Sequence, residues 1–135
     1  MKNFTSKTQI IGQYGEDICT KWLQNNDYSV IERNFTKKEG EIDIIAEKTN
    51  ILHFIEVKSV TREKKENVLR ERSPDEYNPA QNVTREKIAK CFKVISQYKQ
   101  ENNVSYETKT QFDVYTVYID PKNIKHTIER IENCF

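Results

Sequence analysis

The sequence predicts a mixed α/β fold in which a central mixed sheet is flanked by helices, in the order α-β-β-β-α-β. Apolar residues recur at helical spacing over residues 6–26 and again from Thr84 onward. Runs rich in β-branched and aromatic residues predict four strands, over residues 28–35, 40–46, 51–60 and 111–119. The length of 135 residues suits one domain spanning residues 1–135.

Both predicted helices have an apolar stripe and a defined end. The turn-forming run Asn25-Asn26-Asp27 ends the first helix, whose apolar arc consists of Ile10, Ile11, Tyr14, Ile18 and Trp22. The second helix is expected to begin with Thr84 as its N-cap, and Val83 and Ile88 occupy the positions of a hydrophobic staple. Its buried stripe is expected to contain Ile88, Cys91, Phe92, Ile95 and Tyr98.

The segments between these elements predict a hairpin, a loop and an ambiguous tail. Glu47-Lys48-Thr49-Asn50 joins the second and third strands and predicts a hairpin. Residues 61–83 contain two prolines and many charges, so we expect a long charged loop. Residues 123–135 fit either a helix or an edge strand.

Composition excludes several classes of protein. Apolar residues make up 36% and charged residues 32%, and no apolar run is long enough to cross a membrane. The N-terminus lacks the apolar stretch of a signal peptide, and the three cysteines match no disulfide framework or zinc pattern. We therefore expect a soluble cytoplasmic protein with reduced thiols. The glycine-rich motifs that bind nucleoside triphosphates or dinucleotides do not occur in the sequence.

Charge is unevenly distributed along the chain. The net charge is +1, but residues 58–93 contain ten Lys and Arg against six acidic residues, which leaves the remainder at −3. Such a segment is compatible with a face that binds a polyanion, and equally with a solvated surface.

The predicted hairpin brings acidic residues and a lysine together. Alternation places Glu41 and Asp43 on one face with Ile45, opposite Ile42, Ile44 and Ala46, and it places Glu56 and Lys58 on one face of the third strand. One register pairs Asp43 with Glu56 and Glu41 with Lys58. A second register pairs Asp43 with Phe54 and Glu41 with Glu56. Both registers cluster three carboxylates that repel one another unless a cation neutralises them.

This cluster predicts a site for a divalent cation. Mg²⁺ prefers one or two carboxylates together with waters and phosphate oxygens. We expect Asp43, Glu56 and the backbone carbonyl of Val57 to hold it, while Lys58 orients or helps to deprotonate a water and offsets charge in the transition state. The alternative is a hairpin with a charged, solvated end.

Two residues on the predicted helices point toward the same end of the sheet. Glu16 lies at the edge of the apolar arc, where it either reaches the metal or is an exposed residue or the partner of a lysine. Lys87 lies in the first turn of the second helix, where it either meets a phosphate or is solvated. His53 and Asp113 are expected to be structural residues of the core.

Several motifs resemble those of one family. Gly12-x-x-Gly15-Glu16, Asn34, Gly40-Glu41-Ile42-Asp43-Ile44-Ile45-Ala46, Phe54-Ile55-Glu56-Val57-Lys58-Ser59 and the ending from Ile128 to Phe135 are similar to the YraN-type family of presumed endonucleases. That family belongs with the PD-(D/E)xK nucleases of restriction-endonuclease-like fold, akin to archaeal Holliday junction resolvases. The chain departs from the superfamily motif at Ile42, where the motif has proline, and its segment 61–83 is longer than in many members.

The resemblance implies Mg²⁺-dependent cleavage of DNA, with Mn²⁺ as a substitute for Mg²⁺. It makes Asp43 and Glu56 metal ligands, Lys58 the catalytic lysine and Glu16 an accessory carboxylate. Branched DNA is the expected substrate, and a homodimer is expected by analogy because a four-way junction needs two symmetric cuts. Contacts to DNA are expected from Lys87, Arg85, Lys90, Arg62 and Lys64. The alternatives are a nucleic-acid-binding module of the same fold without turnover and, ranked last, a structural adaptor.

Overall fold

The computed structural model describes residues 7–61, 85–120, 122 and 125–132. Helix α1 (Lys7–Asn25) is followed by strands β1 (Ser29–Lys37), β2 (Gly40–Lys48) and β3 (Ile51–Thr61). Helix α3 (Arg85–Glu101) then precedes β4 (Lys109–Asp120) and β5 (Lys125–Ile131). The predicted α/β class and element order are confirmed, and the ambiguous tail contributes β5 as a strand.

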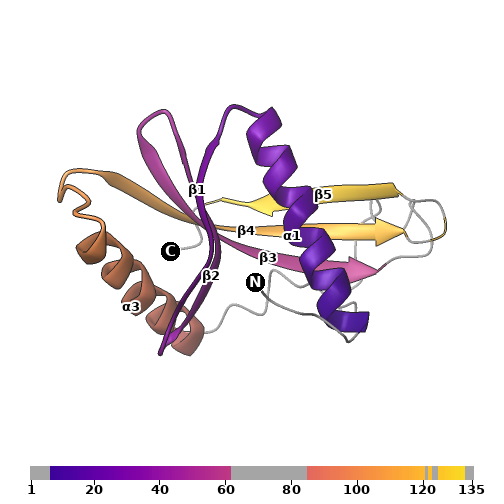
Figure 1. Cartoon of the computed structure of the whole chain (residues 1–135), viewed down its shortest axis with the longest axis horizontal. Helices are drawn as coiled ribbons and strands as arrows, with labels where there is room; N and C mark the ends of the chain where they lie inside the picture. The colour runs from indigo at the N-terminus through magenta and orange to yellow at the C-terminus, as the bar shows by residue number, and fades with distance from the viewer. Residues whose placement is uncertain (1–6, 62–84, 121, 123–124, 133–135) are drawn as a thin grey trace.

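The five strands form one mixed sheet in the order β1-β2-β3-β4-β5 (Figure 1). Neighbouring strands are antiparallel except β3 and β4, which are parallel. The connection from β3 to β4 contains α3, as a parallel pair requires a crossover. β5 pairs with β4, so the edge-strand alternative for the tail is the correct one.

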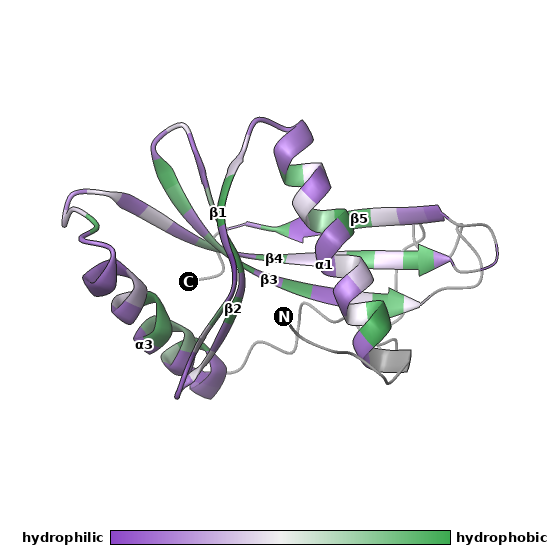
Figure 2. Cartoon of the chain, in the orientation of Figure 1, coloured by the Kyte–Doolittle hydropathy of each residue, from purple (hydrophilic) through white to green (hydrophobic). Residues whose placement is uncertain are grey.

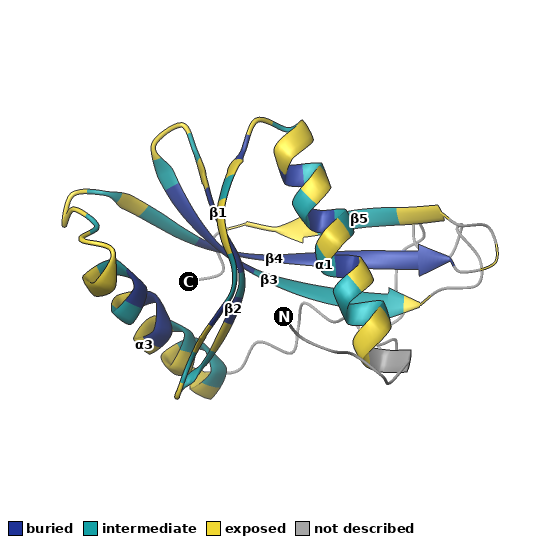
Figure 3. Cartoon of the chain, in the orientation of Figure 1, coloured by how far each residue is buried: buried dark blue, intermediate teal, exposed yellow. Residues whose placement is uncertain are grey.

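The two helices cover opposite faces of the sheet and divide the core in two. Cys19 and Leu23 of α1 pack with residues such as Ile44, Ile55 and Tyr115. On the other face, α3 contributes Val94, Ile95 and Tyr98 to a cluster that contains Ile42, Ile45, Phe54 and Phe112. Figure 2 shows hydrophobic residues gathered in the middle of α3, and Figure 3 shows the burial of β4. None of the helices in the described part of the chain is long and apolar enough to span a membrane.

The buried face of α1 is rotated relative to the prediction. Ile10 and Tyr14 are 54% and 45% exposed, whereas Cys19 and Leu23 are buried. The reason is the close approach of α1 to β3 at Gly15, where an added Cβ would lie 1.8 Å from Oγ of Ser59. The contact line of the helix therefore passes through the glycine. The prediction is confirmed for Ile11, Ile18 and Trp22, which pack against the core, and it is wrong for Ile10 and Tyr14.

The buried stripe of α3 also differs from the prediction at one residue. Phe92 is 49% exposed, whereas Val94, Ile95 and Tyr98 are buried. The prediction for Ile95 and Tyr98 is thus confirmed, and that for Phe92 is wrong. Val94 takes the place of Phe92 in the stripe and belongs to the same core cluster as Phe35, Ile42 and Phe54.

The hairpin has a two-residue turn. Thr49 and Asn50 both have positive φ, 49° and 64°, as a tight type I′ turn between antiparallel strands requires. β2 and β3 pair from Lys48↔Ile51 to Ile44↔Ile55. This register is the first of the two predicted, because its continuation places Asp43 opposite Glu56.

Regular alternation in β2 fails at Asp43. Ile42 belongs to the core under α3 and Ile44 to the core under α1, although the sequence placed them on one face. The partner strand is irregular there, since Asn34 of β1 has a φ of 55°. The pairing of β2 with β3 runs only from Lys48 to Ile44 among the described residues. Asp43 therefore sits where the two strands part.

Candidate active site

The separation of β2 from β3 lets the Asp43 side chain reach the backbone of β3. The Val57 N–H donates to Oδ2 of Asp43 at 2.7 Å. The pKa of Asp43 is raised to about 7, mainly by burial and further by the charges of Glu16, Glu56 and Glu41, while the Val57 hydrogen bond opposes the rise. Asp43 is thus a carboxylate whose charge is poorly compensated by the chain itself.

Glu56 lies on the α3 side of β3 and meets two lysines at one of its oxygens. Nζ of Lys58 is 3.2 Å and Nζ of Lys87 is 2.5 Å from Oε1 of Glu56. The other oxygen, Oε2, is buried and has no hydrogen-bond partner among the described residues. A buried carboxylate oxygen of this kind is costly unless a further group binds it.

Lys87 comes from the first turn of α3, far from β3 in the sequence. Burial lowers the pKa of its ammonium, but the hydrogen bond and charge of Glu56 outweigh burial, so the pKa is raised overall. Its side chain is 33% exposed. The sequence predicted that Lys87 points toward this end of the sheet, and the structure adds its direct contact with Glu56.

Glu16 approaches the cluster from α1 on the other side of the sheet. Its Oε1 lies 3.7 Å from Nη2 of Arg33, which also pairs with Asp17 at 2.9 Å. The Glu16 side chain is 17% exposed, and its charge acts on Asp43. Its cationic partner is an arginine of β1, not the lysine considered above, and nothing in the sequence pattern singled out Arg33.

The described residues contain no group of three or more His, Cys, Asp or Glu side chains that could hold a metal ion. Glu56 is instead turned toward lysines and Glu16 toward Arg33. Two carboxylates are nevertheless a normal protein contribution to a Mg²⁺ site. Asp43 and Glu56 fit this role. The charge of Asp43 is poorly compensated by neighbouring groups, and Oε2 of Glu56 is buried without a hydrogen bond.

A cavity of about 200 Å³ opens beside this cluster, between β2 and α3. Lys90, which is exposed, lines it together with Lys87 and Glu56. Arg85 is exposed at the start of α3. Arg62 and Lys64 lie outside the described residues. The full lining consists of Glu39, Gly40, Glu41, Glu56, Lys87, Lys90, Cys91, Val94 and Phe112.

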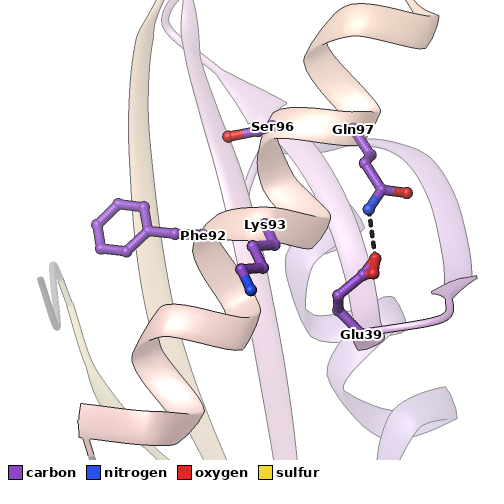
Figure 4. Close-up of a pocket in the computed structure, with 5 residues that line it drawn as sticks. All are labelled: Glu39, Phe92, Lys93, Ser96 and Gln97. Atoms are coloured by element: carbon purple, nitrogen blue, oxygen red, sulfur yellow. Dashed lines mark hydrogen bonds between the residues drawn. The ribbon is translucent and has the colours of Figure 1, made fainter.

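A second hollow lies on the outer side of α3 (Figure 4). Gln97 donates to Glu39 there at 2.6 Å, while Phe92 points away from this pair. A salt bridge joins Lys37 and Glu101, with Nζ of the lysine 2.8 Å from Oε2 of the glutamate. These contacts fasten α3 to the turn between β1 and β2, and so hold the helix that carries Lys87 in place.

His53 and Asp113 form a buried pair inside the sheet. Nδ1 of His53 is 2.8 Å from Oδ2 of Asp113, whose other oxygen accepts from Gln111 at 2.8 Å. The ring of Tyr28 packs edge-on against His53 at 5.1 Å between centroids. This is the satisfied core arrangement expected from the sequence.

Fold and site together define an α/β protein with carboxylates and lysines clustered where two strands of its sheet part. The chain belongs to the family described as Uncharacterised protein family UPF0102, whose model matches residues 15–117. This is the YraN-type family that its motifs resemble.

Relatives in other bacteria cover most of the chain. A UPF0102 protein of Flavobacterium psychrophilum is 35% identical over 125 residues, which cover 93% of this chain and 92% of the relative. One of Campylobacter lari is 39% identical over 82% of this chain and 86% of its own. One of Clostridium botulinum is 32% identical over 93% of both chains.

Proposed function

We propose that the protein is a metal-dependent endonuclease that hydrolyses DNA phosphodiester bonds, with branched DNA as its preferred substrate. The observation that carries this proposal is the meeting of Asp43, Glu56 and Lys58 at the point where β2 leaves β3. The resemblance of the same residues to the PD-(D/E)xK motif supports it. Family membership alone names no activity.

Each residue of the cluster has a separate role in this proposal. Asp43 and Glu56, with the backbone carbonyl of Val57, would hold Mg²⁺ or Mn²⁺. The ion would lower the pKa of a water and neutralise charge on the phosphate. Lys58 orients the attacking water and offsets the charge that develops on the phosphate oxygens. Glu16 assists as an accessory carboxylate from α1, opposite Arg33.

The basic residues of α3 and of the segment before it would contact the DNA backbone. Lys87 and Lys90 line the cavity next to Glu56, and Arg85 precedes them on the same helix. Contacts to phosphates release counterions, so binding should weaken steeply as salt rises. A flat response to salt would contradict this part of the proposal. Symmetric cutting of a junction would require a homodimer.

Cleavage assays test the proposal directly. Wild type, Asp43→Ala and Lys58→Ala are incubated with Mg²⁺ or Mn²⁺ and with linear duplex, single-stranded, flap or four-way-junction DNA. Lys48→Ala is the matched control, because Lys48 lies over the ring of Tyr28 at the hairpin end of β2, away from Asp43. We expect cleavage by wild type and the control, and a loss of about 10²–10³-fold or more in the other two variants.

The outcome also separates the alternatives. Cutting of the four-way junction in preference to linear duplex supports the assignment to branched DNA. Binding without cleavage on all four substrates would overturn the endonuclease and assign the protein to the non-catalytic binding modules. Neither binding nor cleavage would overturn both.

A further inference from the structure

We propose that Lys87 is an exchangeable counter-ion of Glu56. In the metal-free protein, Lys87 pairs with the Glu56 carboxylate. When a divalent cation binds, Lys87 moves away from Glu56, and its ammonium then pairs with a DNA phosphate. The inference rests on the proposed function and assigns to Lys87 a positioning role that the sequence did not indicate.

Two ammonium groups crowd one carboxylate oxygen of Glu56. Nζ of Lys87 and Nζ of Lys58 both lie within 3.2 Å of Oε1 of Glu56. A divalent cation held by Asp43 and Glu56 would add two more positive charges beside these ammonium groups. Like charges at such distances repel strongly in a partly buried site. One of the two lysines must therefore move away from Glu56 when the ion binds.

Lys87 is the lysine that can leave. Lys58 belongs to the same strand as Glu56, and its backbone is fixed by pairing with Thr116 of β4. Lys87 reaches Glu56 from a different element, and its side chain lines the cavity of about 200 Å³ beside the site. A long lysine side chain on a helix can swing into that space without any change in the sheet.

The place to which Lys87 moves is suited to a phosphate. The cavity is also lined by the exposed Lys90, one turn further along α3. Lys87 lies in the first turn of the helix, where the dipole favours an anion, and Lys90 follows one turn later. DNA bound at the carboxylates would bring its backbone to this side of the cluster. The exchange thus couples the arrival of the metal to the binding of the substrate.

Calorimetry with Mn²⁺ and the full chain, without DNA, tests the exchange. Lys87→Met keeps the length of the side chain and removes its charge, and Lys87→Arg keeps the charge. Lys93→Met is the matched control, because Lys93 is exposed on the same helix and does not line this cavity. We expect Lys87→Met to bind Mn²⁺ about tenfold more tightly than wild type, and the other two variants to stay within about threefold of it.

Several results would overturn the inference. Unchanged or weaker Mn²⁺ binding in Lys87→Met, with or without a lower melting temperature, would make the ion pair merely structural. If wild type binds Mn²⁺ and cleaves DNA in that case, only this inference fails. If wild type neither binds Mn²⁺ nor cleaves DNA, the proposed function fails with it.

DNA binding tests the second half of the exchange. Fluorescence polarisation is measured with a four-way junction whose phosphorothioate linkages resist cleavage, so that Lys58 stays in place beside Glu56. We expect Lys87→Met to weaken binding when Mn²⁺ is present and to leave it unchanged in EDTA, because Lys87 exchanges Glu56 for a phosphate only after the metal has arrived. Equal weakening in both conditions would contradict the exchange.

Discussion

The metal-free protein should become more stable when Asp43 is replaced by asparagine. Its pKa is about 7 against an ordinary value of 3.8, and burial is the main cause. The difference corresponds to at most about 4 kcal/mol of unfavourable free energy for the ionised carboxylate in the folded state, and solvent relaxation reduces this to about 1–3 kcal/mol. The asparagine carbonyl can still accept the hydrogen bond from Val57.

The sign of the pH dependence follows from the raised pKa. Between about pH 4 and pH 7 the folded state holds a proton on Asp43 that the unfolded chain has lost. The contribution of Asp43 to stability is therefore complete at low pH and is lost as the pH rises through about 7. The Asp43→Asn variant lacks this loss, so its advantage over wild type should grow from pH 5 to pH 8.

Urea unfolding in EDTA across this range measures the effect. The exposed Glu107 provides the control, since Glu107→Gln makes the same chemical change away from the cluster. Excess Mg²⁺ should then stabilise wild type and leave Asp43→Asn unchanged, because a bound cation compensates the ionised carboxylate. An Asp43→Asn variant that is less stable than wild type at pH 8, or an advantage independent of pH, would refute the reasoning.

Two further predictions concern the elements that position the site. Gly15→Ala should destabilise the fold by about 1–3 kcal/mol in urea unfolding, because its Cβ would overlap Ser59. Gly12→Ala is the control, and it should be neutral or stabilising because the space around its Cβ is open. Equal effects of the two substitutions would argue against the close approach of α1 to β3. Gln97→Ala should cost about 1 kcal/mol and speed amide exchange in α3, because it loses the bond to Glu39. Unchanged exchange would show that this bond does not hold the helix.

The elements of this fold could be predicted from local patterns because each has a strong one. The β-branched runs and the turn residues Thr49 and Asn50 define the hairpin without help from the rest of the chain. The tail remained ambiguous because its apolar residues satisfy both helical and strand periods. Its pairing with β4 decides the matter, and pairing of this kind is a property of the assembled sheet.

The site could be predicted only in part, for a similar reason. Asp43, Glu56 and Lys58 come from one hairpin, so the register of the hairpin brings them to the same end before any tertiary contact is known. Lys87 is brought to Glu56 by the packing of α3, and Arg33 to Glu16 by the packing of α1 on β1. Sequence spacing contains no information on such contacts.

The break at Asp43 was missed because alternation was assumed to continue along β2. A strand that kept its period would have put Ile42 with Ile44 in the core under α1, and Ile45 would then have faced α3 without Ile42. The structure divides them, one under α3 and one under α1. The carboxylate between them is thereby released from the regular pattern and turned toward the backbone of β3.

Part of the negative charge of the cluster is compensated before any metal arrives. Glu16 faces Arg33, and Glu56 faces Lys58 and Lys87, whereas Asp43 keeps a raised pKa among the acidic residues. A cation must then compete with resident lysines for Glu56, which weakens its binding to the free protein. DNA that draws Lys87 away would strengthen it. Under the proposed function, such a site would hold its metal firmly only with substrate in place, and this would limit indiscriminate hydrolysis.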